Sequence, residues 1–367
     1  IRSKALSDKI LRNTWDSAEP FVLFIDRMNR KNKLWYCETI DATNPCGEQP
    51  LPPYGACLLG SFNLTRYIER NWSEVDPKPL MFNWQKFIHD IHPVVRAMDN
   101  VVDRAVYPLP EQELEAKNKR RMGLGVTGLA NTMEILGMPY GSQEGKHWVE
   151  QVMSTLRDTA YRASISLAIE KDPFPLYSLQ YLDSEFAETL PEDIKDGIYK
   201  HGIRNSHLLS VAPTGTISLT ANNVSSGIEP VFSHQYERDV RTFDGIKTEL
   251  VKDYAYNYYG VKGKTADELS VFDHVEMLNL VSKYIDSACS KTCNVGDDVT
   301  WEDFKDVYMR AYDGGASGCT TFRASGKRFG ILRASKDEEV VEEPETPKDD
   351  FISEGAACYI DPDTGLR

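Results

Sequence analysis

The sequence of 367 residues lacks the long apolar run that a membrane-spanning helix requires. It opens on no recognisable signal peptide and contains no internal repeat, and so we expect a cytoplasmic protein without a membrane partner. Basic residues are in the minority, because 42 lysines and arginines stand against 56 acidic residues, for a formal net charge of −14. This balance argues against direct nucleic-acid binding as the main function.

The cysteine patterns of zinc sites and of paired redox thiols are also missing. The chain has seven cysteines but no CxxC pair and no Cys/His cluster with zinc-finger spacing, so no metal site is predicted. An odd number of cysteines without a secretory signal is typical of free or catalytic thiols in a reducing compartment. Cys289 and Cys293 lie four apart on a predicted helix, and two small core residues are their simplest interpretation.

What the sequence does contain is a stretch, residues 44–57, around which the rest is organised. It places an amide, a thiol and a carboxylate at alternate positions, Asn44, Cys46 and Glu48. In an extended backbone, side chains two residues apart share one face, so these three are predicted to converge in one pocket. The prolines and glycines that follow forbid a helix and bend the chain, which brings Cys57 within reach. We interpret this stretch as a thiol-based active site on a loop.

Three kinds of thiol catalysis are compatible with this loop. A nucleophilic cysteine needs a base such as histidine, and no histidine lies near Cys46 in sequence. A redox pair needs a second thiol, which is a role that suits Cys57. A thiyl radical needs a radical-generating cofactor and a pocket that excludes water. The Asn-x-Cys-x-Glu alternation favours the radical chemistry at Cys46.

Apolar periodicity gives a coarse map of the remaining chain. It predicts a buried strand over 21–26 and helices over 84–106, 148–170, 192–201, 275–289 and 301–312. Pro93 is expected to kink or split the first of these helices. The glycines at 123, 125 and 128 resemble a phosphate loop, but no convincing strand precedes them. Close backbone packing is therefore the favoured interpretation of these glycines.

A second informative stretch is residues 204–218. An apolar strand from Leu208 to Val211 leads into a hydroxyl-rich turn and a predicted helix start. Free N–H groups at such a terminus bind anions, although a simple N-cap turn is the alternative.

The end of the chain is different in composition. Residues 334–350 hold eight acidic residues against two lysines and predict a flexible acidic linker. Residues 351–367 form a tail segment that carries Cys358 as a tethered thiol.

Residues 44–64 closely resemble the finger loop of ribonucleotide reductases. Their sequence is similar to the form found in the adenosylcobalamin-dependent class II catalytic chain. Further matches follow in the order of that family, and together they cover roughly residues 20–333. They are residues 24–29, 123–130, 204–205, 212–218, 227–230, 290–292 and 318–323.

The resemblance implies an α/β fold class. Residues 1–333 would form the later part of a ten-stranded α/β barrel with a central finger loop over 44–57, followed by the flexible acidic tail. The front portion of the barrel, with the effector site and the other reducing cysteine, would be absent or on a separate chain. That portion, a homodimer partner, the ribonucleotide substrate and a thioredoxin- or glutaredoxin-type reductant are the implied partners.

The resemblance also implies roles for individual residues. Cys46 would become the thiyl radical that takes the ribose 3′ hydrogen, with Glu48 as the base at the 3′ hydroxyl. Asn44 would orient the substrate, Cys57 would reduce the 2′ carbon, and Cys358 would shuttle thiols from the tail. The substrate phosphates would lie on the turn formed by Ala212, Pro213, Thr214, Gly215, Thr216 and Ser218.

The resemblance favours adenosylcobalamin as the radical-generating cofactor. A class I large subunit, which receives its radical from a metal-containing partner through adjacent tyrosines near the last barrel strand, is the alternative. The matching region here reads Thr320-Thr321-Phe322-Arg323, and Tyr258-Tyr259 lies well upstream. A glycyl-radical enzyme or a non-autonomous half-chain are further alternatives. The resemblance assigns no role to Cys289 and Cys293.

Overall fold

The computed structural model describes residues 3–56, 58–69, 80–242, 245–323 and 333–334. Its helices are α1 (Ser3–Ser17), α2 (Ile25–Lys31), α3 (Trp84–Arg104), α4 (Pro110–Lys119), α5 (Leu129–Ile135), α6 (Gln143–Lys171), α7 (Glu185–Glu188), α8 (Glu192–His201), α9 (Ile217–Thr220), α10 (Tyr254–Tyr259), α11 (Val271–Ser282) and α12 (Trp301–Asp313). Short 3-10 turns cover Leu64–Tyr67, Leu179–Asp183 and Ala266–Glu268. The strands are β1 (Val22–Leu23), β2 (Ala42–Thr43), β3 (Pro50–Leu51), β4 (Leu59–Asn63), β5 (Ile68–Glu69), β6 (Met81–Phe82), β7 (Gly123–Thr127), β8 (Gln235–Thr242), β9 (Gly245–Lys252), β10 (Thr292–Val295), β11 (Gly318–Arg323) and β12 (Arg333–Ala334).

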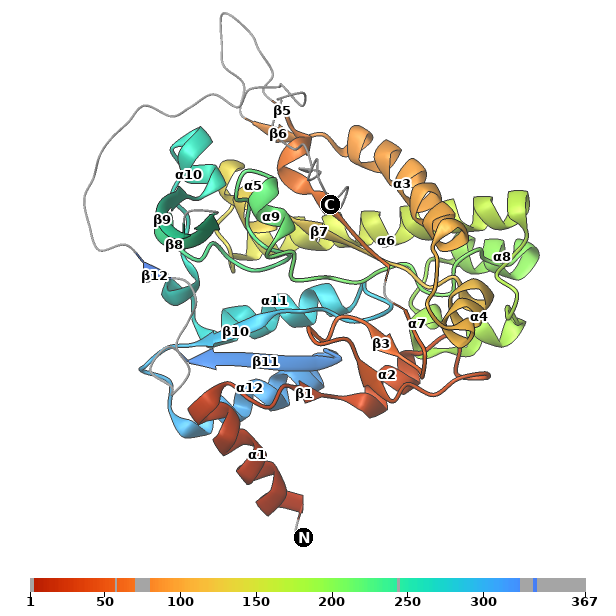
Figure 1. Ribbon diagram of the computed structural model, residues 1–367, viewed down its shortest axis with the longest axis horizontal. Coiled ribbons are helices and arrows are strands. Elements are labelled where there is room, and N and C mark those ends of the chain that lie inside the picture. The colour runs from red at the N-terminus through yellow and green to blue at the C-terminus, as the bar shows by residue number, and fades with distance from the viewer. Residues whose placement is uncertain (1–2, 57, 70–79, 243–244, 324–332, 335–367) are drawn as a thin grey trace, which may run out of the picture.

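The central strands form an open, mainly parallel sheet. β4 pairs in parallel with β7, and single parallel bridges continue the sheet from Leu124 to Leu209 and from Val211 to Cys289. β10 then pairs in parallel with β11, whose other edge pairs antiparallel with β1. Figure 1 shows β10 and β11 side by side, with α11 and α12 alongside. The α/β class is confirmed, whereas the ten-stranded barrel stays a prediction because the described strands do not close.

The glycines of β7 let three backbones approach closely. A Cβ atom on Gly125 would lie 2.3 Å from the carbonyl oxygen of Ser210, and one on Gly123 would lie 2.1 Å from Nε2 of Gln49. Both distances are too short for any side chain, so glycine is required at these positions. The interpretation of this stretch as close backbone packing is confirmed. The stretch itself is a strand, and the loop that carries Gln49 covers one of its faces.

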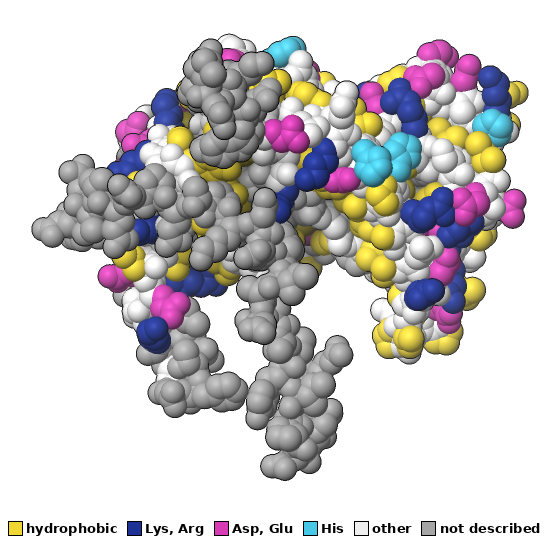
Figure 2. Space-filling model, turned by 90° about the horizontal axis from the view of Figure 1, so that it is seen from above, with side chains coloured by type: hydrophobic (Ala, Val, Ile, Leu, Met, Phe, Trp, Pro, Cys, Tyr) yellow, Lys and Arg dark blue, Asp and Glu magenta, His cyan; other side chains and the backbone are white. Residues whose placement is uncertain are grey.

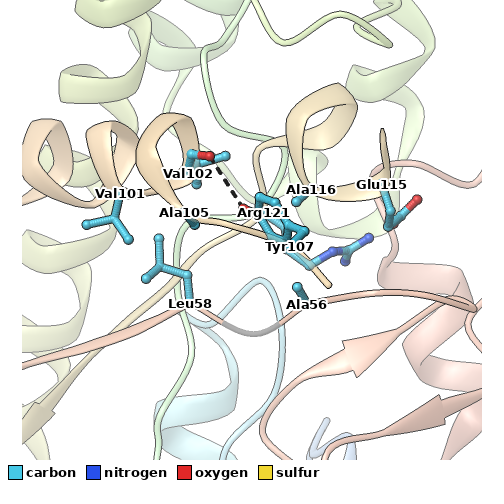
Figure 3. Close-up of a pocket in the computed structure, with 9 residues that line it drawn as sticks. All are labelled: Ala56, Leu58, Val101, Val102, Ala105, Tyr107, Glu115, Ala116 and Arg121. Atoms are coloured by element: carbon cyan, nitrogen blue, oxygen red, sulfur yellow. Dashed lines mark hydrogen bonds between the residues drawn. The ribbon is translucent and has the colours of Figure 1, made fainter. Parts of the chain in front are cut away.

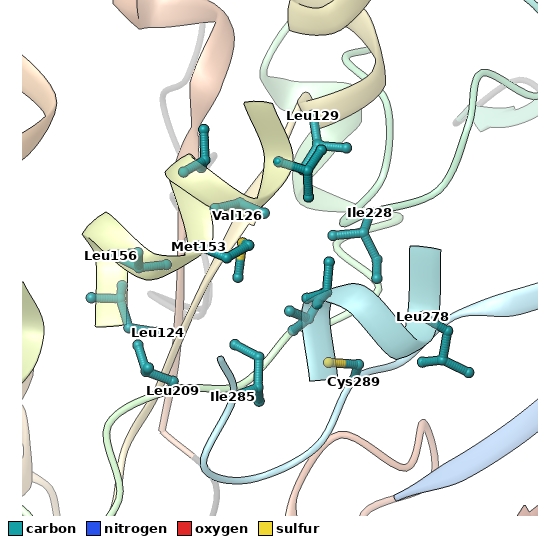
Figure 4. Close-up of a cluster of buried hydrophobic side chains, with 14 of the residues drawn as sticks. Leu124, Val126, Leu129, Met153, Leu156, Leu209, Ile228, Leu278, Ile285 and Cys289 are labelled. Atoms are coloured by element: carbon teal, nitrogen blue, oxygen red, sulfur yellow. The ribbon is translucent and has the colours of Figure 1, made fainter. Parts of the chain in front are cut away.

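The other face of this sheet packs on helices, as expected for buried parallel strands. Figure 4 shows Leu124 and Val126 of β7 near Met153 and Leu156 of α6. α3 also packs against α6, with its apolar face buried and its chain unbroken at Pro93. Pro93 therefore does not split the helix, and the alternative of a kink at Pro93 stays a prediction.

The other predicted helices are present in the structure, although their ends differ and the helix predicted over 275–289 stops early. α6, α8 and α12 confirm the helices predicted over 148–170, 192–201 and 301–312. α11, however, ends at Ser282, so Cys289 and Cys293 lie in extended chain rather than on a helix. Both are buried, which confirms that they are core residues. The strand predicted over 21–26 is shorter than expected, because α2 already begins at Ile25.

The surface carries no single dominant charge on the face that Figure 2 shows. Basic, acidic and hydrophobic side chains alternate there wherever the described residues are visible. Within the described ranges, no helix combines the length and the apolar character needed to cross a membrane. The predicted linker and the Cys358 segment, residues 335–367, lie outside the described residues.

Candidate active site

The Cys46 turn, residues 44–49, connects β2 to β3 in a short antiparallel hairpin. Its backbone is a compact turn rather than an extended strand. The prediction that Asn44, Cys46 and Glu48 share one face of an extended chain was therefore wrong. Gly47 has a φ of +81°, a conformation that favours glycine, and a Cβ atom there would also meet the ring of Phe21. Asn44 closes the turn, because its Oδ1 accepts a hydrogen bond of 3.0 Å from the backbone N–H of Gln49.

The side chains of the turn differ sharply in exposure. Cys46 is exposed, whereas Glu48 is only 1% exposed and Gln49 is fully buried. Oε2 of Glu48 and both polar side-chain atoms of Gln49 are buried without a hydrogen-bond partner in the part of the chain that the structure describes. Burial of unpaired polar atoms is unfavourable, and functional sites are where it is most often tolerated.

Backbone contacts fix the turn to the sheet. The carbonyl oxygen of Glu48 accepts hydrogen bonds from the backbone N–H of Ala288 at 3.0 Å and from the hydroxyl of Ser210 at 2.8 Å. These partners belong to the two neighbouring segments that the bridge between Val211 and Cys289 joins. These hydrogen bonds attach the Cys46 turn to the sheet beside Val211, the last bridged residue before the turn at 212–218.

The protonation state of Cys46 bears on its chemistry. Partial desolvation, followed by the nearby charge of Glu48, raises the pKa of the Cys46 thiol above its ordinary value. A nucleophilic cysteine requires the opposite shift, because the thiolate is the reactive form. The surroundings of Cys46 therefore favour a neutral S–H group at neutral pH.

The turn at residues 212–218 was predicted to hold phosphate groups. Thr214 has a φ of +54°, and its side-chain oxygen contacts that of Thr127 at 2.9 Å and accepts a hydrogen bond from the N–H of Gly227 at 2.8 Å. Its hydroxyl therefore serves the protein scaffold. Gly215 and Ser218 instead line a cavity of about 590 Å³.

This cavity is the larger of two that bear on the site. Its walls come from the 215–238 region, from β10 and from Phe322 of β11. Asn44, Cys46 and Glu48 do not line it. The structure thus brings the predicted phosphate turn to a cavity of nucleotide size and docks the Cys46 turn on the adjoining strand segments. It does not place the two in one cavity.

A buried ion pair on the cavity wall joins two motifs that sequence analysis had noted without assigning a role. Lys291 donates a hydrogen bond of 2.7 Å to Oε2 of Glu229, and the backbone N–H of Thr292 donates one of 2.6 Å to Oε1. Glu229 and Thr292 both line the cavity. The two motifs lie 62 residues apart, and no local pattern in the sequence indicates that they meet.

A smaller cavity of about 120 Å³ lies between the start of β4 and helices α3 and α4 (Figure 3). Ala56 and Leu58 line it together with Val101, Val102 and Arg121. Cys57, the predicted reducing thiol between the first two of these residues, lies outside the described residues, as does Cys358. Neither thiol can therefore be placed relative to Cys46.

Arg204 and Asn205 of the 204–205 motif serve the framework, because both bind a buried carboxylate that lies outside the motifs. Asp99 of α3 is fully buried and accepts hydrogen bonds from Arg120, Arg204 and Asn205 at 2.9, 3.3 and 3.0 Å. Asp286, also buried, accepts the backbone N–H groups of Leu208 and Leu209 and pairs with Lys33 at 2.8 Å. No group of three or more metal-ligating side chains exists among the described residues, which include His89 and His92.

The fold and this arrangement define an α/β protein that presents a thiol-bearing turn on a parallel sheet, on strand segments that adjoin a cavity with both apolar and polar walls. The chain belongs to the ribonucleotide reductase family, because its residues 1–322 match the model of the ribonucleotide reductase barrel domain.

Named relatives agree with this family. The vitamin B12-dependent ribonucleoside-diphosphate reductase of Thermoplasma acidophilum is 34% identical over 361 residues, which cover 91% of this chain and 44% of the relative. A protein of the same name from Mycobacterium tuberculosis (strain CDC 1551 / Oshkosh) is 31% identical, with 93% of this chain and 50% of the relative covered. The ribonucleoside-diphosphate reductase large subunit of monkeypox virus is 28% identical over 65% of this chain. The chain spans about half the length of the B12-dependent relatives.

Proposed function

We propose that this chain carries the thiyl-radical site of an enzyme that reduces ribonucleotides to 2′-deoxyribonucleotides for DNA synthesis. The observation that carries the proposal is the docking of the Cys46 turn on the segment that continues into the 212–218 turn. The Cys46 turn is thus attached to Ser210, two residues before the turn that is proposed to bind the phosphates. Membership of the ribonucleotide reductase family supports the same reaction.

In the proposed reaction Cys46 acts as a sulfur-centred radical. It takes the hydrogen atom from the ribose 3′ carbon and returns one later, so Cys46 is unchanged overall. Its raised pKa fits this role, because hydrogen-atom transfer uses the neutral S–H group. The net change is one ribonucleotide and two thiols giving one deoxyribonucleotide, one disulfide and one water. Cys57 would supply one of the two thiols.

Glu48 and Asn44 would handle the substrate hydroxyl groups. Glu48 is the proposed base at the 3′ hydroxyl, and its buried, unpaired Oε2 is an available hydrogen-bond acceptor. Asn44 already uses Oδ1 to close the turn, so only its amide N–H groups remain to orient the substrate. Its proposed role is therefore double, since it shapes the turn and also binds substrate.

Adenosylcobalamin is the proposed cofactor, in line with the names of the relatives from Thermoplasma and Mycobacterium. When bound, it supplies the radical that oxidises the Cys46 thiol. The cavity of about 590 Å³, with its serine, asparagine and aromatic walls, is assigned to the nucleotide substrate, so no described residue is assigned to the adenosyl part of the cofactor. No residue of the chain is assigned to the corrin ring.

The alternative is a class I large subunit, which one relative is named for. The tyrosines 258 and 259 end helix α10, where both pack with Tyr254 in a separate hydrophobic cluster. β11 presents Phe322 to the cavity instead. This arrangement favours the cobalamin-dependent proposal, because β11 lacks the adjacent tyrosines of the alternative.

The open sheet supports a further partner. β4 and β1 form its two edges among the described strands, and exposed edges pair readily with further strands. We propose that the N-terminal portion of the same enzyme completes the ten-stranded barrel there. Regeneration would then come from Cys358 and a thioredoxin- or glutaredoxin-type reductant.

The test is reduction of a ribonucleoside diphosphate and triphosphate by the full-length protein, with and without adenosylcobalamin. The proposal predicts turnover only with the cofactor. Equal turnover without it would overturn the cobalamin assignment, and a radical-delivering metal subunit that restored activity would favour the class I alternative.

A further inference from the structure

Glu229 forms part of the cavity wall and has no role in the proposed mechanism. Several buried contacts nevertheless fix its position. The Glu229 side chain is 25% exposed and lines the cavity, while its partner Lys291 is fully buried behind it. Backbone contacts fix the same segment on both sides. Gly227 donates to Thr214, and the carbonyl oxygen of Ile228 accepts a hydrogen bond of 2.6 Å from Tyr140.

The ammonium group of Lys291 uses all three of its N–H donors in contacts within the protein. The group lies 2.7 Å from Oε2 of Glu229, 3.1 Å from the carbonyl oxygen of Thr292 and 3.1 Å from Nδ1 of His274. Burial, followed by the charge of Lys291, lowers the pKa of His274 to about 3, so this histidine is neutral and its Nδ1 accepts. The three N–H donors of Lys291 are therefore used, and it cannot contact a ligand directly.

Glu229, in contrast, keeps free acceptor capacity. Each carboxylate oxygen has two lone pairs, and each receives one hydrogen bond from the described residues. A carboxylate repels phosphate, so the phosphates belong near Gly215 and Ser218 rather than near Glu229. The sugar hydroxyls are assigned to Asn44 and Glu48, so what remains for Glu229 is the base of a nucleotide, which carries N–H donors.

We propose that Glu229 accepts hydrogen bonds from the base of a nucleotide in this cavity, and that Lys291 is the positioning residue that orients Glu229. This inference rests on the proposed function and adds a specificity-determining contact to it. Neutral His274 is the second support, since its Nδ1 accepts a hydrogen bond from Lys291 while its Nε2 bonds to the carbonyl oxygen of Ala266.

The experiment measures binding to the full-length protein by titration calorimetry, with ADP, 2′,3′-dideoxy-ADP and inorganic pyrophosphate as probes. Glu229→Gln keeps the shape of the side chain but removes its charge. It is expected to weaken ADP binding roughly tenfold and to leave pyrophosphate binding unchanged. Asp267→Asn, which removes another carboxylate lining the same cavity, is the matched control and should leave ADP binding unchanged.

Variants of Lys291 separate positioning from contact. Lys291→Met should weaken ADP binding as Glu229→Gln does, while Lys291→Arg should restore most of it because the positive charge returns. Thermal unfolding of each variant reports whether it is folded. If Lys291→Met does not fold, Glu229→Gln decides the question alone.

The dideoxy probe identifies the donors. The loss of affinity in Glu229→Gln should persist with 2′,3′-dideoxy-ADP, because the proposed donors lie on the base. Equal binding of this probe by the wild type and Glu229→Gln would place the donors on the sugar and overturn the inference. Unchanged ADP binding in Glu229→Gln, or a parallel loss of pyrophosphate binding, would overturn the inference alone. A wild-type protein that binds none of the probes would overturn the proposed function as well.

Discussion

The Cys46 turn and the Asp99 cluster both contain polar residues of the family motifs, which are Arg204 and Asn205 in the Asp99 cluster, yet the hydrogen bonding of their buried carboxylates differs. In the Asp99 cluster the buried carboxylate is bound on both oxygens by Arg120, Arg204 and Asn205. In the Cys46 turn, Glu48 and Gln49 bury polar side-chain atoms without partners among the described residues. The comparison teaches that a motif alone does not separate framework from chemistry. We propose that unpaired buried polar atoms mark the chemistry in the Cys46 turn, and the variants below test this.

The largest expected effect concerns Cys46. Cys46→Ser should abolish nucleotide reduction by the full-length protein, because a hydroxyl group does not form the radical that a thiol forms. Near-ultraviolet circular dichroism should be unchanged, since the side chain is exposed. Cys37→Ser is the matched control, because Cys37 is the other exposed free cysteine among the described residues and lies outside the turn. Substantial turnover by Cys46→Ser would show that Cys46 is not the catalytic thiol, and the contrast between the Cys46 turn and the Asp99 cluster would then have no functional meaning.

Glu48→Gln tests whether the unpaired carboxylate works as a base. Loss of general base catalysis should lower kcat by about 10²- to 10⁴-fold. The free energy of unfolding should change little, because no partner of Oε2 is lost. A variant with normal kcat but reduced stability in urea would show that Glu48 belongs to the framework, as Asp99 does.

Asp99→Ala should act on stability. It leaves Arg120 buried without its central partner, and we expect a loss of about 3–5 kcal/mol in the free energy of unfolding, measured in urea. Asp103→Ala removes the half-exposed partner of the same arginine and should cost less than about 1 kcal/mol. Equal losses in the two variants would contradict the assignment of Asp99 as the anchor.

Glu134 sharpens the comparison, because it is a buried carboxylate outside the Cys46 turn, and its oxygens have no hydrogen-bond partner among the residues that the structure describes. Burial, followed by the charge of Asp253, raises its pKa from 4.5 to about 8, so the folded protein keeps it neutral at pH 7. The folded state therefore binds a proton that the unfolded state releases, and stability should fall as the pH rises from about 4.5 to about 8.

Glu134→Gln should remove this part of the pH dependence and raise stability at pH 8 by about 1–3 kcal/mol. Urea unfolding at pH 5 and pH 8 checks it. If the wild type and the variant changed in parallel between these pH values, Glu134 would be ionised in the folded protein. An unpaired carboxylate would then not need to be neutral outside an active site.

Local patterns were sufficient to predict much of the fold. Apolar periodicity located α6, α8 and α12, and the glycines of β7 correctly indicated close backbone packing. The geometry of the Cys46 turn was missed, because its positive φ at Gly47 and its closure by Asn44 depend on the turn as a whole. Alternation of polar residues was mistaken for an extended strand.

Contacts between distant segments could not be predicted in this way. The pairing of Glu229 with Lys291 joins chain segments that only the fold brings together. Cys289 and Cys293 were assigned to a helix because four-residue spacing is compatible with one, but the helix ends before them. Asn44, Cys46 and Glu48 were singled out from their chemical types, but the burial of Glu48 and the exposure of Cys46 are seen only in the structure, and their roles stay predictions.

The most direct test of the central claim is rapid-freeze electron paramagnetic resonance on the full-length protein mixed with adenosylcobalamin and a ribonucleoside diphosphate. A sulfur-centred radical should appear in the wild type and in Cys37→Ser, and it should be absent in Cys46→Ser. The same radical in Cys46→Ser would contradict the assignment of this turn as the radical site.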